Sequence, residues 1–190
     1  MTAPTEWKPA AIHELQRHFG SFTDWTLCGG CSLDLIVGRQ TRPHTDIDVG
    51  VFRSQLVACL NAIGKDQVFL CRPAGSRVLW DGSAINSAVH DIWISDRDRK
   101  YWLMQIMVFE DKGERVFYRR DPRIWWPKRS HSSPIDGLQV LNPLITFLYK
   151  ANRLKMDEKD VKDINTCIEA ELTRRCGEPR HGLATTKSSE

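Results

Sequence analysis

The sequence predicts an α+β fold, in which a mixed β-sheet is flanked by helices and followed by a small helical part. Three observations lead to this prediction. Helical spacing and short β-prone runs occur over residues 9–63, and a series of further β-prone runs, separated by turn signals, continues to residue 118. Two amphipathic helical patterns then lie between residues 141 and 172.

The chain has 190 residues, of which 41% are hydrophobic and 27% are charged. This composition is typical of one globular core with a helical appendage, and it excludes wholesale disorder and fibrous repeats. No apolar run is long enough to span a membrane, and no secretory signal is visible. We therefore expect a cytoplasmic protein that has no membrane partner.

The formal net charge is only +3, from 27 basic and 24 acidic side chains. So small a charge argues against extensive contact with nucleic acid. The basic excess lies in residues 113–190, which carry 15 basic and 11 acidic side chains. This excess fits either an anionic partner or a solvated helical face.

The first half of the chain is predicted to form three helices and two strands in alternation. Gly20 and Gly38 follow two of the helical patterns and are expected to end them. The expected elements are a helix over 9–19, a strand over 25–28, a helix over 31–37, a polar loop over 39–45, a strand over 47–52 and a helix containing Leu56, Leu60 and Ile63.

The second half is predicted to form strands first and helices last. The expected strands are 68–71, 77–80, 88–95, 102–109 and 115–118, and the expected helices are 141–154 and 158–172. Residues 121–137 contain three prolines and are expected to form a long loop. We accordingly divide the chain into a core (1–137), a C-terminal helical segment (138–176) and a flexible tail (177–190).

The segment Gly29–Phe52 contains the most informative motifs. Gly29 and Gly30 follow a predicted strand and precede a helix. Backbone N–H groups exposed at such a junction bind phosphate oxygens, and the helix dipole strengthens the interaction. Gly-Gly turns also occur without any ligand, so the glycine pair alone does not define a site.

Two carboxylates, Asp46 and Asp48, begin the next predicted strand. Residues at i and i+2 share one face of a strand, so these carboxylates repel each other unless a cation lies between them. Hard ions such as Mg²⁺ take oxygen ligands of this kind. The alternative is a loop end exposed to solvent. The glycine pair, the short helix and the Asp-x-Asp together are more specific than any one of them.

A third carboxylate is expected if two metal ions share the site, and Asp91 is our choice. It lies within the apolar run Val89–Ile94, where a buried Asp is costly without a partner or a metal. An Asp at the end of an edge strand is the alternative interpretation. Glu110, at the end of the next strand, is the competing candidate.

Several motifs occur in a characteristic order. They are Gly29-Gly30, Leu33-Asp34-Leu35, Gly38-Arg39, Thr41-Arg42, His44, Asp46-Ile47-Asp48, His90-Asp91-Ile92-Trp93, the Gln105–Glu110 strand, Tyr149-Lys150 and the Lys159–Asp163 segment. Together they resemble the nucleotidyltransferase fold of DNA polymerase beta-like enzymes, and more narrowly the aminoglycoside nucleotidyltransferase (adenylyltransferase) family. The resemblance implies a nucleotidyltransferase-type mixed sheet flanked by helices.

The resemblance also implies a Mg²⁺-dependent enzyme that uses ATP or another NTP as co-substrate. Asp46, Asp48 and Asp91 would bind the metal, and Asp91 would accept the proton of the acceptor hydroxyl. Gly29, Gly30 and Ser32 would bind the β- and γ-phosphates. Arg42, His44 and Lys150 would add positive charge there, although Arg42 and His44 also fit a role in ordering the loop and Lys150 fits a solvated helix position.

The acceptor implied by the resemblance is the hydroxyl of a small molecule, with an aminoglycoside-like antibiotic as first choice. Two departures from the family pattern bear on the acceptor: Cys31 follows the glycine pair, and Leu144 follows Pro143 where an acid is expected. A non-catalytic or regulatory nucleotide-binding member of the fold is the alternative, as is transfer to protein or RNA.

Other features have simpler interpretations. Trp125-Trp126, followed by Lys128 and Arg129, fits a stacking platform, but a hydrophobic lid or partner contact is preferred. His131 is expected at the surface. Cys28 and Cys31 flank the glycine pair, and because nothing completes a zinc set, a tight loop is favoured over a redox or metal site.

Overall fold

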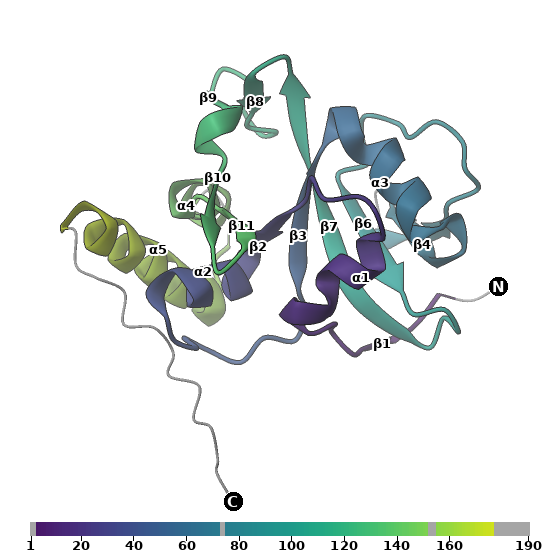
Figure 1. Cartoon of the computed structure of the whole chain (residues 1–190), viewed down its shortest axis with the longest axis horizontal. Coiled ribbons are helices and arrows are strands. Elements are labelled where there is room, and N and C mark those ends of the chain that lie inside the picture. The colour runs from purple at the N-terminus through teal and green to yellow at the C-terminus, as the bar shows by residue number, and fades with distance from the viewer. Residues whose placement is uncertain (1–2, 73–74, 152–154, 177–190) are drawn as a thin grey trace, which may run out of the picture.

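A computed structural model describes residues 3–72, 75–151 and 155–176 (Figure 1). Its helices and strands follow one another as expected for an α+β fold. They are β1 (Glu6–Trp7), α1 (Leu15–Phe19), β2 (Thr26–Cys28), α2 (Gly29–Val37), β3 (Asp48–Phe52), α3 (Leu56–Ile63), β4 (Val68–Cys71), β5 (Arg77–Leu79), β6 (Asp91–Ser95), β7 (Tyr101–Lys112), β8 (Arg115–Phe117), β9 (Trp125–Pro127), β10 (Ser132–Ile135), β11 (Leu138–Leu141), α4 (Pro143–Ala151) and α5 (Glu158–Cys176).

A mixed sheet organises these elements. Its strands lie in the order β10-β11-β2-β3-β7-β6-β4-β5, while β1 also pairs with β7, and β8 and β9 extend the far end of β7. The long strand β7 is central: β3 runs parallel to it on one side and β6 antiparallel on the other. The predicted mixed sheet is therefore confirmed.

The two faces of β7 differ, as the period-two alternation of its side chains requires. Met104 and Ile106 are fully buried, whereas Gln105 and Met107 are half-buried on the opposite face. Helices α1 and α3 cover the apolar face, and their side chains join the same cluster as these β7 residues. Figure 1 shows α1 and α3 in front of the central strands. The other face is left for the polar pocket described below.

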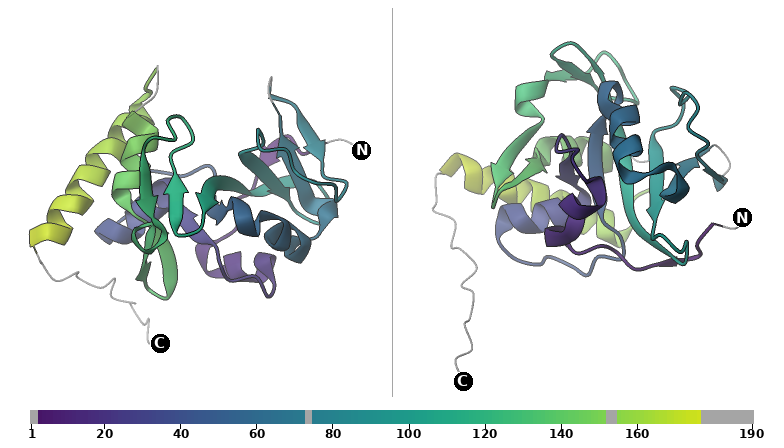
Figure 2. Two further views of the ribbon diagram at one scale, coloured as in Figure 1. Left: turned by 90° about the horizontal axis from the view of Figure 1, so that it is seen from above. Right: turned by 45° about the vertical axis from the view of Figure 1, so that its right-hand side comes forward.

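Helices α4 and α5 pack against each other and lie together with α2, away from α1 and α3 (Figure 2). Ile145 and Tyr149 of α4 contact a small cluster that includes Phe109 of β7. Within the described residues, no helix is long and apolar enough to cross a membrane.

Helix ends in the first half follow their glycines. Gly20 and Gly38 both have positive φ, at 56° and 72°, directly after α1 and α2. Only glycine adopts such angles without strain, so these residues stop the helices where the sequence predicts.

The prediction of a long loop over 121–137 is wrong. This segment contains β9, which pairs with β8, and β10, which pairs with β11. Pro134 lies in β10 at the edge of the sheet, where a missing N–H is tolerated. The strands depend on pairing with residues distant in sequence, which local composition does not reveal.

The first residues of the predicted helical segment also differ from expectation. Leu138–Leu141 form β11, which pairs in parallel with β2, and the helix begins at Pro143. The apolar side chains of β11 are buried against the sheet instead of continuing the helical pattern. The tail 177–190 lies outside the described residues.

Candidate active site

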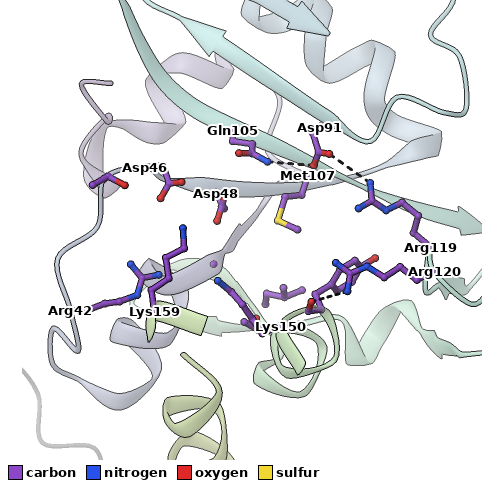
Figure 3. Close-up of a pocket in the computed structure, with 15 residues that line it drawn as sticks. Arg42, Asp46, Asp48, Asp91, Gln105, Met107, Arg119, Arg120, Lys150 and Lys159 are labelled. Atoms are coloured by element: carbon purple, nitrogen blue, oxygen red, sulfur yellow. Dashed lines mark hydrogen bonds and ion pairs between the residues drawn. The ribbon is translucent and has the colours of Figure 1, made fainter. Parts of the chain in front are cut away.

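A pocket of about 310 Å³ opens where α2, β3, β6, β7 and α4 meet. Figure 3 shows its charged side chains pointing toward a common space. Of the predicted site residues, Asp46, Asp48, Asp91, Gly29, Arg42 and Lys150 line this pocket, together with Thr45, Gln105, Met107, Arg119, Arg120, Leu141, Thr146, Tyr149 and Lys159. The fold thus brings together six of the nine predicted residues from distant parts of the chain.

Gly29 lies directly against Asp48. It is the first residue of α2, and its φ of 67° is one that other residues rarely adopt. A Cβ at this position would overlap the Asp48 carboxylate. Glycine is therefore required here both by backbone conformation and by space, and the N-terminus of α2 stays open to the pocket.

The carboxylate of Asp48 is difficult to ionise. Burial is the main cause that raises its pKa to about 6, and the negative charges of Asp46 and Asp91 raise it further, whereas Lys150 and Arg42 lower it. Neither Asp46 nor Asp48 receives a hydrogen bond from any described residue. A pair of carboxylates without donors is the donor set that suits a hard cation, because Mg²⁺ takes one or two carboxylates and fills its other positions with water and phosphate oxygens.

Asp91 lies farther from this pair. It is opposite Met107 on β7, while Asp48 is opposite Gln105, so β7 lies between the two strands that carry these carboxylates. Gln105 donates a hydrogen bond to Asp91 at 3.4 Å. Among the described residues, no group of three or more His, Cys, Asp or Glu side chains is placed to hold one metal ion. Asp46 and Asp48 are therefore a carboxylate pair of a kind that suits a metal ion, here called the metal-type pair, and the strand that carries Asp91 lies two strands away from that of Asp48.

Arg42 and Lys150 are fixed by α5. Arg42 binds Asp163 through Nε at 2.8 Å and Nη2 at 2.9 Å, and Lys150 Nζ lies 2.8 Å from Asp163 and 3.1 Å from Asp160. Burial raises the pKa of Asp163, but the hydrogen bonds from Arg42 and Lys150 outweigh it and hold that pKa below its usual range. The two cations therefore reach the pocket rim as members of a buried ion-pair network.

Three predicted phosphate-binding residues lie outside the pocket lining. Ser32 is fully buried and its Oγ donates to the carbonyl of Gly29 at 2.7 Å. Nε2 of His44 lies 2.6 Å from Oδ2 of Asp34, and this contact fits the alternative role of His44 in ordering the loop. Gly30 is buried beneath that loop, and a Cβ on it would collide with the side chains of Arg42 and His44.

Arg119 and Arg120 line the pocket but were missed in the sequence analysis. They follow β8, and the turn after that strand carries them back toward α4. Their only sequence signal is a pair of adjacent cations in the basic second half, which is common on solvated surfaces. The pairing of β8 with β7, which the sequence does not reveal, brings the two arginines to the site.

The prediction of a surface position for His131 is wrong. It is buried, stacks on Trp126 and accepts a hydrogen bond from its Nε1 at 3.1 Å. Trp125, in contrast, is half exposed and stacks with Arg115. Trp126 therefore packs against the core, while the preferred interpretation of the pair as a lid or partner contact stays a prediction.

Two comparisons with known proteins bear on this geometry. Residues 12–73 match the family model described as aminoglycoside-2''-adenylyltransferase. The crystal structure of the lincosamide antibiotic adenylyltransferase LnuA, lincomycin-bound, aligns with a TM-score of 0.51 and 15% identity, over 84% of this chain and 93% of that chain. The chain has the nucleotidyltransferase fold.

The predicted fold is thereby confirmed, and residues 12–73 are similar to the adenylyltransferase family. The structure of ANT(2'')-Ia in complex with adenylyl-2''-tobramycin aligns with a TM-score of 0.46 and 13% identity, over 86% of this chain and 89% of that chain. This TM-score is too low to support an inference about the present chain. No curated protein matches the sequence. In this nucleotidyltransferase fold, the matched segment contains the glycine pair, Asp46 and Asp48, and ends before Asp91.

Proposed function

We propose that the protein transfers a nucleotidyl group, AMP from ATP, to a hydroxyl of a small molecule in a Mg²⁺-dependent reaction. The observation that supports this proposal is the meeting of Gly29 with Asp46 and Asp48 in one pocket. The N-terminus of α2, a position of the kind that can bind phosphate, thus lies beside a carboxylate pair that suits a divalent cation.

Each end of the pocket has a role in this reaction. The backbone at Gly29 and the side chains of Arg42 and Lys150 bind the phosphates. Asp46 and Asp48 would hold Mg²⁺, which when bound neutralises charge on the attacking and leaving oxygens. Asp91 accepts the proton of the acceptor hydroxyl.

The transfer step conserves atoms and charge. The acceptor oxygen forms a bond to the α-phosphorus of ATP, and its proton passes to the Asp91 carboxylate. The bond from the α-phosphorus to the bridging oxygen breaks, and the electron pair leaves with pyrophosphate. This chain's residues bind, orient and neutralise, which is how catalysis of phosphoryl-type transfer chiefly operates.

The test is a transfer assay with ATP labelled in the α-phosphate, in the presence of Mg²⁺. The acceptor panel contains neutral, cationic and anionic small hydroxyl compounds, among them the aminoglycosides that the family description suggests, along with proteins and RNA. We expect label on a small molecule and loss of transfer in Asp48→Asn, while the exposed control Asp98→Asn keeps the wild-type rate. Label on protein or RNA alone would contradict the proposed acceptor class.

A non-catalytic nucleotide-binding member of the fold is the second candidate. It is favoured by the register of β3 and β7, which places an amide, Gln105, opposite Asp48. Asp91 lies beyond β7, so the residue next to Asp48 on the neighbouring strand supplies no third carboxylate. This candidate predicts Mg²⁺-dependent ATP binding without pyrophosphate release for every acceptor in the panel.

A further inference from the structure

The charged side chains of the pocket are not evenly distributed. Figure 3 shows Arg42, Lys159 and Asp46 at one end, and Arg119 and Arg120 at the other, with Asp91 near Arg119. The lining contains five basic and three acidic side chains, of which two acids form the metal-type pair. Among the residues that line the pocket, Asp91 is the acidic one that lies at the end formed by Arg119 and Arg120.

Arg119 has unused hydrogen-bonding capacity. Its Nη1 lies 3.7 Å from Asp91, which is an ion-pair contact longer than a hydrogen bond, and its side chain is 31% exposed. Within the described part of the chain, no group accepts a hydrogen bond from the Arg119 guanidinium. Because a guanidinium presents donors in a planar fork, Arg119 is ready to bind a carboxylate or phosphate through two hydrogen bonds.

Arg120 differs from Arg119 because the protein holds it. Its Nη1 donates to the carbonyl of Tyr149 at 3.0 Å, and its guanidinium lies near the Tyr149 ring. Arg120 therefore adds fixed positive charge to this end of the pocket, which disfavours a cationic group close to it.

The position of Arg119 bears on the acceptor. The proposed function places the acceptor hydroxyl beside Asp91, so any substituent of the acceptor near that hydroxyl meets Arg119. A polycation would face two arginines there, with Asp91 as the acidic side chain beside them in the pocket lining. An acceptor with a negative group would meet a matching partner instead.

We propose that the acceptor is an anionic hydroxyl compound, and that Arg119 binds its carboxylate or phosphate group. This proposal rests on the proposed function, because it uses Asp91 to locate the acceptor. The proposed acceptor has the opposite charge to the polycationic antibiotic that the sequence resemblance implies. Arg119 determines specificity, while phosphate binding and metal binding remain with residues at the other end of the pocket.

The test uses four compounds with one hexose scaffold and different charge. Glucose is neutral, glucosamine is cationic, and glucuronate and glucose 6-phosphate are anionic through a carboxylate and a phosphate. Their binding to the protein saturated with Mg²⁺ and a non-transferable ATP analogue is measured by calorimetry, alongside tobramycin. We expect glucuronate or glucose 6-phosphate to bind about ten-fold or more tightly than glucose, and glucosamine and tobramycin to bind least.

The Arg119→Gln variant is expected to remove this preference and leave the affinity for Mg²⁺ and ATP within about two-fold. Arg123→Gln is the matched control, because Arg123 is an exposed arginine in the same turn whose guanidinium pairs with Asp121. It should retain the wild-type preference.

Three results would overturn the proposal: tighter binding of glucosamine or tobramycin, no preference among the four hexoses, or binding of none of them while Mg²⁺ and ATP bind normally. Weaker ATP binding in Arg119→Gln would also overturn it, by assigning Arg119 to the nucleotide. Failure of ATP to bind the wild type, with Arg119-dependent binding of an anionic hexose, would leave the anion site standing and remove the nucleotidyltransferase function.

Discussion

At the scale of single residues, the site depends on a carboxylate that the fold places unfavourably. Asp48 is pressed against Gly29, lacks a hydrogen-bond donor among the described residues and lies near two other negative charges. Such an arrangement lowers stability unless a ligand compensates for it. Residues of this kind are candidates for function because packing alone does not explain them.

The raised pKa of Asp48 predicts a specific pH dependence. The unfolded chain releases this proton near its ordinary pKa of 3.8, whereas the folded protein holds it to about pH 6. Stability is therefore lost as pH rises through that window and stays reduced above it. Asp48→Asn should stabilise the metal-free protein by about 3 kcal/mol at pH 7.5 and by only about 0.5 kcal/mol at pH 4, as measured by urea unfolding.

The exposed control Asp98→Asn should change stability little at either pH. An equal gain from Asp48→Asn at pH 4 and pH 7.5 would show that ionisation of Asp48 does not cause the instability.

His131 predicts the opposite dependence. Burial lowers the pKa of His131 to about 3, below its ordinary value of 6.5, so the folded state stays neutral where the unfolded chain takes up a proton. Its contribution to stability is full above pH 6.5 and falls by about 1.4 kcal/mol per pH unit below it. Unfolding of His131→Gln should lack this slope between pH 6.5 and pH 5, whereas the exposed control His13→Gln should keep it.

At the scale of elements, α5 holds together the end of the pocket formed by Arg42 and Lys150. The side chain of Asp163 is 1% exposed and binds both Arg42, from the loop before β3, and Lys150, from α4. One carboxylate thus joins three segments that are far apart in sequence. Removing it leaves two buried cations without their shared partner.

Asp163→Asn should therefore destabilise the protein by about 3–5 kcal/mol and weaken ATP binding. The control is Glu169→Gln, also on α5, because its pair with Arg39 is exposed, at 54% and 45% of the two side chains, and should contribute under about 1 kcal/mol. Denaturant unfolding and calorimetry measure the two effects. Equal losses in both variants would contradict the role of the buried network.

The order of elements could largely be predicted from the sequence, for local reasons. Gly20 and Gly38 end helices, and the alternation of side-chain types along β3 and β7 is visible in the sequence. The strands β9, β10 and β11 could not be predicted, because they depend on pairing with β8 and β2. Pro134 in β10 was misleading for the same reason: an edge strand tolerates a proline that local rules assign to a loop.

The candidate site was predicted only in part, and the limits are physical. Asp46, Asp48 and Gly29 lie close in sequence, so their motif is visible there. Arg119 and Gln105 line the pocket because of strand register, and Asp163 holds Arg42 there because of helix packing, neither of which is visible in sequence spacing. His44 and Ser32 match the motif but do not line the pocket: His44 contacts Asp34 and orders the loop, and Ser32 donates to the carbonyl of Gly29 within the helix.

At the scale of the whole molecule, the two faces of the sheet have different roles. One face packs against α1 and α3 and supplies the apolar core, while the other face directs charged side chains into a pocket closed by α4 and α5. The near-neutral net charge of +3 therefore conceals a pocket in which acids and bases are concentrated.

The most direct test of this account is the binding of ATP to the wild type and to Asp48→Asn, measured by calorimetry with and without Mg²⁺. We expect the wild type to bind ATP when Mg²⁺ is present, and we expect omission of Mg²⁺ or the Asp48→Asn substitution to abolish this binding. Absence of ATP binding to the wild type, or equal binding by the folded Asp48→Asn variant in Mg²⁺, would contradict it.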